Sequence, residues 1–103
     1  MISGYLIKHP NAVKQHVFDF SSDIPENDFI GDYTITIVNA AGDDVIATDE
    51  VSYQADINTN DITVEFSGGI DGENYLVTVQ ISLDTSTTTP VRIVEMRVRS
   101  KDV

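Results

Sequence analysis

The sequence contains no cysteine, so neither a disulfide bond nor a thiolate metal site can support its fold. It has no apolar run approaching the roughly 20 residues of a membrane-spanning helix. Its first residues also lack the basic region and cleavage site of a signal peptide. At 103 residues and 41% hydrophobic content, the chain has the length and composition of one folded domain with a core.

Basic residues are few and lie only near the two ends of the chain: Lys8, Lys14, Arg92, Arg97, Arg99 and Lys101. Of the 17 acidic residues, all except Glu95 and Asp102 lie between positions 17 and 90. An acidic body repels phosphate backbones, so we expect no nucleic-acid partner, and we expect no membrane partner either. One interpretation is that the acidic charge only keeps the surface soluble. The other is that, in addition, the basic residues at the two ends form a basic pole that docks on an acidic partner.

Apolar residues follow the period of a β-strand, and no segment has the i, i+3, i+4, i+7 spacing of a helix. The alternation is clearest from Tyr75 to Leu83, which is typical of a strand with one buried face. Similar patterns predict strands near 18–20, 32–37, 62–66 and 94–99, with weaker candidates at 45–47 and 51–55. The sequence therefore predicts an all-β fold, an immunoglobulin-like antiparallel β-sandwich of six to seven short strands. A small closed barrel is the alternative.

Residues 1–12 lack clean alternation and are interpreted as an N-terminal arm, poorly ordered in the free protein and ordered by a neighbouring chain. Residues 13–103 are predicted to form the sandwich domain. Within that domain, Val79 and Ile81 are expected to be buried in a central strand.

Glycines concentrate between the two clearest strands, at Gly68, Gly69 and Gly72. They either shape a ligand pocket or supply positive φ angles for a tight reversal, and we favour the reversal. Tyr75 is then expected to close the end of the core.

Catalytic motifs are missing, since the chain has no phosphate-binding glycine loop, nucleophile elbow or His-Glu-x-x-His helix. His16 shares its strand face with Phe18 and is expected at the edge of the core, whereas His9 is interpreted as a contact residue. Acidic clusters in the turns lack the spacing of a calcium loop, and turn aspartates usually bind their own backbone. We therefore expect no enzyme activity, no metal and no cofactor.

Three short segments carry a resemblance to a known family: Lys8-His9-Pro10, Phe18-Asp19-Phe20-Ser21, and Ser67–Tyr75 followed by Val77-Thr78-Val79. The chain resembles, over roughly residues 8–98, small immunoglobulin-like proteins encoded among the head and head–tail genes of tailed phages and prophages. This resemblance implies a virion structural role and brings no catalytic residues with it.

From this resemblance we expect a non-enzymatic virion structural protein, and we prefer a capsid decoration or cement protein that binds the major capsid protein lattice. The alternative is a neck, tail or fibre-associated β-sandwich module that binds a surface carbohydrate or another virion protein. The expected location is the virion, on the phage head surface or in the head–tail region. Homo-oligomer formation is left open.

The residues predicted to bind the partner come from the arm and the terminal strands: Tyr5, Lys8, His9, Lys14, Arg97 and Arg99. We expect both arginines to point out of the core with Lys14 close by. Such a basic patch predicts salt-sensitive binding to an acidic partner. The competing interpretation is that these charges only protect an edge strand from aggregation.

Overall fold

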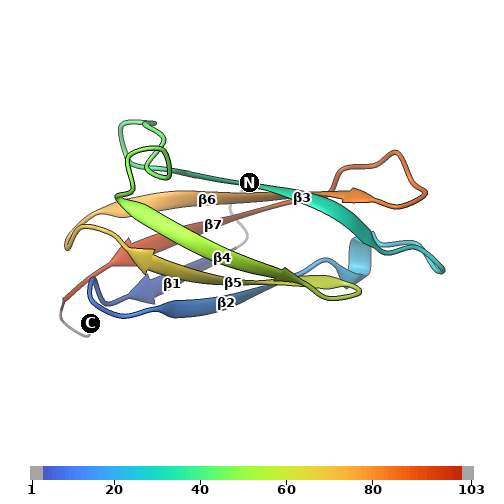
Figure 1. The fold of residues 1–103 in the computed structure, drawn as a ribbon, viewed down its shortest axis with the longest axis horizontal. Coiled ribbons are helices and arrows are strands. Elements are labelled where there is room, and N and C mark those ends of the chain that lie inside the picture. Colours follow the sequence, from blue (N-terminus) through green and yellow to red (C-terminus); the bar gives the residue numbers. More distant parts are fainter. Residues whose placement is uncertain (1–3, 101–103) are drawn as a thin grey trace.

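Seven strands and one turn of 3-10 helix make up the fold in a computed structural model that describes residues 4–100 (Figure 1). In chain order the elements are β1 (Gly4–Lys8), β2 (Lys14–Asp19), η1 (Ser21–Asp23), β3 (Ile30–Val38), β4 (Val51–Ile57), β5 (Asp61–Gly68), β6 (Asn74–Leu83) and β7 (Val91–Val98). The strands run along the length of the molecule. The β3–β4 connection lies at one end and the β6–β7 connection lies at the other (Figure 1).

The strands form two separate sheets, one in the order β1-β7-β6-β3 and the other in the order β2-β5-β4. Immunoglobulin domains of the constant type place their second, fifth and fourth strands in one sheet and their third, sixth and seventh in the other. Strands β2 to β7 follow that arrangement. The prediction of an immunoglobulin-like sandwich is therefore confirmed, and the barrel alternative is excluded for the described residues.

The first strand departs from the predicted organisation. Residues 4–8 form β1, which pairs in parallel with β7 from Gly4 opposite Val94 to Lys8 opposite Val98. The structure thus places residues 4–8 in a sheet, whereas the sequence predicts that they belong to an arm that a neighbouring chain orders. Residues 1–3 lie outside the described part of the chain.

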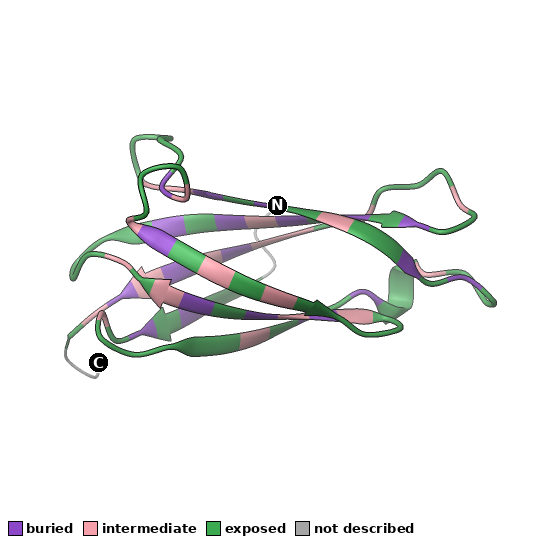
Figure 2. Ribbon diagram, viewed as in Figure 1, coloured by how far each residue is buried: buried purple, intermediate pink, exposed green. Residues whose placement is uncertain are grey.

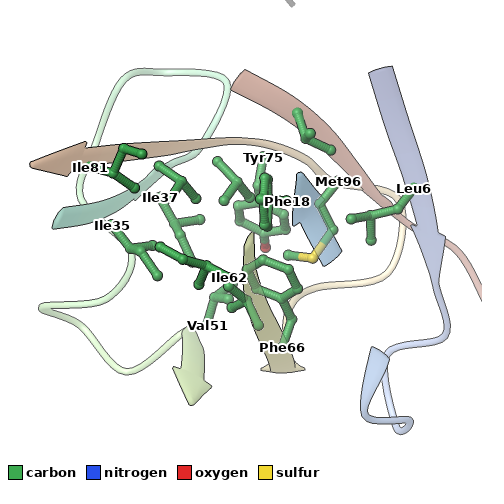
Figure 3. Packing of buried hydrophobic residues seen from close by; sticks show 14 of the residues in the cluster. Leu6, Phe18, Ile35, Ile37, Val51, Ile62, Phe66, Tyr75, Ile81 and Met96 are labelled. Carbon is green, nitrogen blue, oxygen red and sulfur yellow. The ribbon is translucent and has the colours of Figure 1, made fainter. Parts of the chain in front are cut away.

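The core lies between the two sheets and follows the alternation of the sequence (Figures 2 and 3). Strand β6 lies between β7 and β3, and its residues alternate between buried and outward positions along their length. Val79 and Ile81 are fully buried there, whereas Gln80 is exposed. The predicted central strand and its two faces are confirmed.

The turn between β5 and β6 is held by glycines and by Tyr75. Gly68 and Gly69 have φ angles of +82° and +99°, a region that favours glycine. The buried Tyr75 hydroxyl donates a hydrogen bond to Glu50 Oε2 at 2.7 Å and accepts one from the Ile70 N–H at 2.9 Å. Burial, reinforced by the Glu50 bond, raises the pKa of Tyr75 to about 12. This arrangement is a tyrosine corner, typical of immunoglobulin-like sandwiches.

Asp28 anchors the connection between β6 and β7 at the opposite end of the molecule. Its Oδ1 accepts hydrogen bonds from the N–H groups of Phe29 and Thr85, and its Oδ2 accepts one from Ser86 N–H at 3.1 Å. Burial by itself raises the pKa of this carboxyl, but the hydrogen bonds from Phe29, Ser86 and Thr85 outweigh it and lower the pKa to about 2. The ionised carboxylate therefore stabilises this connection.

Acid should release this anchor. A carboxylate whose pKa is lower in the folded state stabilises the fold above its ordinary pKa near 3.8, and this contribution is lost as the pH falls toward about 2. We expect Asp28→Asn to lower the thermal unfolding midpoint at neutral pH, and the difference from the wild type to shrink as the pH falls to about 2. Glu26→Gln, at an exposed position nearby, is the control. A difference that stays constant over this pH range would contradict the role of the ionised carboxylate.

Candidate partner-binding surface

The structure places two of the predicted partner-binding residues, Tyr5 and Arg97, in direct contact on the outer face of the four-stranded sheet. Tyr5 is 59% exposed on β1. The Arg97 guanidinium lies 4.2 Å from the centre of its ring, a cation–π contact. The parallel pairing of β1 with β7 makes this contact, because it sets Tyr5 opposite Glu95 and Ile7 opposite Arg97.

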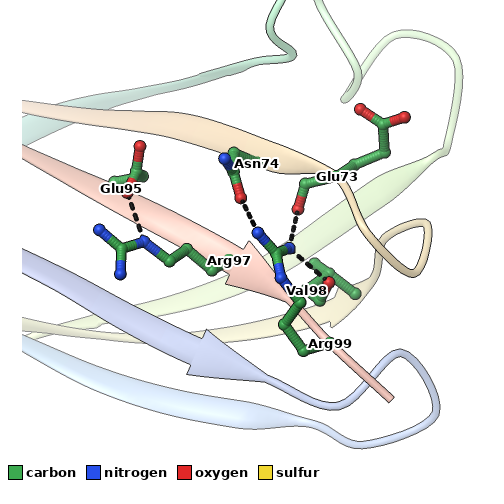
Figure 4. Close-up of polar contacts among 6 residues, drawn as sticks. All are labelled: Glu73, Asn74, Glu95, Arg97, Val98 and Arg99. Atoms are coloured by element: carbon green, nitrogen blue, oxygen red, sulfur yellow. Dashed lines mark hydrogen bonds and ion pairs between the residues drawn. The ribbon is translucent and has the colours of Figure 1, made fainter. Parts of the chain in front are cut away.

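Arg97 is held in place from a second side. Its Nε donates a hydrogen bond to Glu95 Oε1 at 2.6 Å, as Figure 4 shows. The Arg97 side chain nevertheless keeps 41% of its surface exposed. Glu95 and Arg97 share one strand face, while Met96 between them is buried. The expectation that Arg97 points out of the core is confirmed.

Arg99 follows β7 and is anchored by neighbouring polar groups (Figure 4). It donates hydrogen bonds to Asn74 Oδ1 at 2.7 Å and to the carbonyl oxygens of Val98 at 2.8 Å and Glu73 at 3.1 Å. Tyr5, Ile7, Arg97, Arg99 and Asn74 line one shallow hollow together with Glu95. We call these six residues the Tyr5–Arg97 surface.

Lys8 is part of the fold, which corrects its interpretation as an exposed contact. It points to the inner side of β1, as Leu6 does, and it is 1% exposed. Its Nζ donates hydrogen bonds to the carbonyl oxygens of Gly68 at 2.7 Å and His9 at 2.9 Å. Burial lowers the pKa of Lys8. The buried side chain thus ties the β1–β2 connection to the glycine turn.

His9 lies near Arg99, whose N–H donates a hydrogen bond to the carbonyl oxygen of the preceding Lys8 at 2.9 Å, whereas Lys14 lies apart from both arginines. His9 is exposed in the β1–β2 connection, where its Nδ1 accepts a hydrogen bond from Asn11 N–H at 3.1 Å. Lys14 begins β2 in the other sheet, opposite Phe66. The structure therefore does not gather Lys14 with Arg97 and Arg99 on one sheet, as the sequence had led us to expect.

The charges on the two sheets differ. Within the strands, the outer face of β2-β5-β4 carries acidic residues and no basic one: Asp19, Asp56, Asp61 and Glu65. The outer face of β1-β7-β6-β3 carries charges that balance, with Asp32, Glu95, Arg97 and the adjoining Arg99. The outer face of this sheet is therefore close to neutral, and the six residues of the Tyr5–Arg97 surface carry two arginines and one glutamate. The expected basic patch of both arginines with Lys14 is not formed, because Lys14 lies in the other sheet.

Sequence reasoning missed two apolar contributors to this face, Ile7 and Leu76. Ile7 and Leu76 are each 38% exposed. Leu76 could have been found, because it is an apolar residue at an outward position of the clearest strand. Ile7 could not, because the short run Tyr5-Leu6-Ile7 shows no alternation.

Within residues 4–100, no three His, Asp or Glu side chains group as a metal site. No helix in the same range has the length and apolar character to cross a bilayer.

The fold and this surface define an immunoglobulin-like β-sandwich with an exposed tyrosine–arginine cluster of the kind enriched in protein interfaces. Residues 8–95 match the family model described as podophage GP4 fiber-tail adaptor protein gp77, and the chain belongs to that family. No curated protein and no solved structure matches the chain.

The family supports the expectation of a phage virion structural protein. It gives no support to capsid decoration or to the major capsid protein as the partner. The tail- and fibre-associated alternative fits the family better, so we correct the preferred interpretation in that direction.

Proposed function

We propose that this chain is a structural adaptor of a podophage particle, which joins a fibre to the tail by binding other virion proteins. The match of residues 8–95 to a fiber-tail adaptor family carries the proposal. An adaptor holds two partners, so it needs at least two separate binding surfaces on a stable body. The two sheets of this sandwich offer outer faces of different charge.

We assign the Tyr5–Arg97 surface to one of these partners. Tyrosine and arginine are enriched among the residues that carry most of the binding energy in protein interfaces. Arg97 is held by Glu95 and by the Tyr5 ring, and Arg99 is held by Asn74. Side chains that are already ordered lose less conformational entropy on binding, which favours affinity.

Binding at this surface should depend only modestly on salt. The Arg97 charge is paired with Glu95 at 2.6 Å, so Arg99 is the one charge of this surface left for long-range attraction. This differs from the salt-sensitive docking expected of an uncompensated basic patch. The partner surface should be mainly apolar and polar, with few charges.

Particles assembled without this chain test the adaptor role. We expect them to keep the head and tail and to lack the fibres, and we expect the wild-type chain supplied in trans to restore the fibres. Mass spectrometry of purified particles measures each component. Normal fibre content without the chain, or absence of the chain from wild-type particles, would overturn the proposed function.

A further inference from the structure

We propose that the open edge of β2 accepts an extended segment of a partner protein as an additional strand. That the partner is a virion protein rests on the proposed function. Strand β2 ends the sheet β2-β5-β4, and no strand among the described residues pairs with its other side. In constant-type immunoglobulin domains the first strand occupies this position. Here β1 pairs with β7 instead, which leaves the position beside β2 open.

The phase of the hydrogen bonds shows which backbone groups face the open edge. Phe20 N–H donates to Asn60 O at 3.0 Å, continuing the ladder between β2 and β5. Residues in an antiparallel pair alternate between bonding to the partner strand and pointing away from it. His16 and Phe18 therefore bond to β5, and Gln15 and Val17 direct their N–H and C=O groups outward. The register of β2 on β5 is continuous, so no bulge protects this edge.

A hollow beside this edge can take a side chain from the added strand. Its volume is about 190 Å³, and it lies between β2 and the strands β1 and β7. His16 and Phe18 line it from β2, and Val94 lines it from β7. An added strand points every second side chain inward, so an apolar residue at such a position would enter this space.

Acidic residues beside the β2 edge favour basic side chains at the outward positions of the added strand. They also disfavour a second copy of this chain as the occupant of the edge. The outer face beside β2 carries Asp19, Asp61 and Glu65. Pairing two copies through β2 would bring their acidic faces together, and neighbouring like charges on one sheet face are destabilising. We therefore assign the edge to a partner segment that alternates apolar residues with lysine or arginine.

Binding of short peptides to the isolated chain tests this assignment. The probes are overlapping peptides that tile the tail and fibre proteins of the same phage. We expect a peptide of alternating apolar and basic residues to bind, and we expect hydrogen exchange at the Gln15 and Val17 amides to slow when it does. Val17→Pro removes an outward N–H that the β2–β5 ladder does not use, so the dissociation constant should rise about tenfold or more. Val17→Thr keeps the N–H and should bind as the wild type does.

Each other outcome would overturn the inference. Equal binding by Val17→Pro, or unchanged exchange at Gln15 and Val17, would place the peptide elsewhere. If no tiled peptide bound the wild-type chain, the edge would not be a strand acceptor for these proteins. A concentration-dependent dimer that Val17→Pro abolishes would make a second copy the occupant. Because the amide readout uses the wild-type chain, a folding defect of the proline variant cannot decide the result. The peptide experiment can fail while particle composition still supports the adaptor role. Equally, a peptide can bind at the β2 edge even if particle composition contradicts the adaptor role.

Discussion

Phe66→Ala is expected to lower the free energy of unfolding by about 3–5 kcal/mol, the usual cost of removing a buried aromatic side chain. Phe66 lies on β5, the central strand of its sheet, and it is fully buried. Its ring centre is 6.5 Å from that of Phe18 in an edge-to-face arrangement. Truncation would leave a cavity between the sheets and remove this aromatic pair (Figure 3).

Glu65→Ala is the matched control, because Glu65 precedes Phe66 and points to the acidic outer face. Removing a like charge there should leave stability unchanged or raise it slightly. Urea denaturation of the two variants and the wild type measures the difference. Equal destabilisation by both substitutions would contradict the assignment of faces on β5.

Substitutions in the Tyr5–Arg97 surface should have the largest effect on assembly. Truncating a tyrosine or arginine at the centre of an interface often costs about 2 kcal/mol or more. We expect Tyr5→Ala and Arg97→Ala each to reduce the occupancy of the chain in purified particles about tenfold or more at limiting expression. Tyr5 is exposed and Arg97 lies on an outer face, so neither change opens the core.

Two controls separate this surface from general effects of charge. Lys14→Ala removes a basic residue in the other sheet, and Gln54→Ala changes an exposed position on β4. Both should be incorporated normally, and thermal unfolding should show all four variants folded. Loss of incorporation in Lys14→Ala, with Tyr5→Ala unaffected, would contradict the assignment of a partner to the Tyr5–Arg97 surface.

Local alternation was enough to predict the sandwich and the orientation of its clearest strands. On β6, each outward residue between Val77 and Leu83 is polar, so burial on one face dictates the pattern. On β7 the same rule placed Arg97 outward and Met96 inward. The features that the sequence did not predict, such as strand β1, depend on contacts between residues far apart in the chain. Strand β1 has five residues and depends on pairing with β7, far along the chain.

Lys8 shows why the candidate site could be predicted only in part. A lysine is usually exposed, and its burial here depends on the Gly68 carbonyl, 60 positions away. Arg97 and Glu95 could be placed on one face from the sequence, but the Tyr5 contact required the parallel register of β1. The separation of Lys14 from the two arginines therefore emerged only from the fold.

A cryo-electron microscopy reconstruction of the tail region tests the central claim most directly. We expect density for this seven-stranded sandwich at the junction of fibre and tail, with the Tyr5–Arg97 surface buried against a neighbouring virion protein. Density for the sandwich elsewhere in the particle, or at the junction with Tyr5 and Arg97 open to solvent, would contradict it.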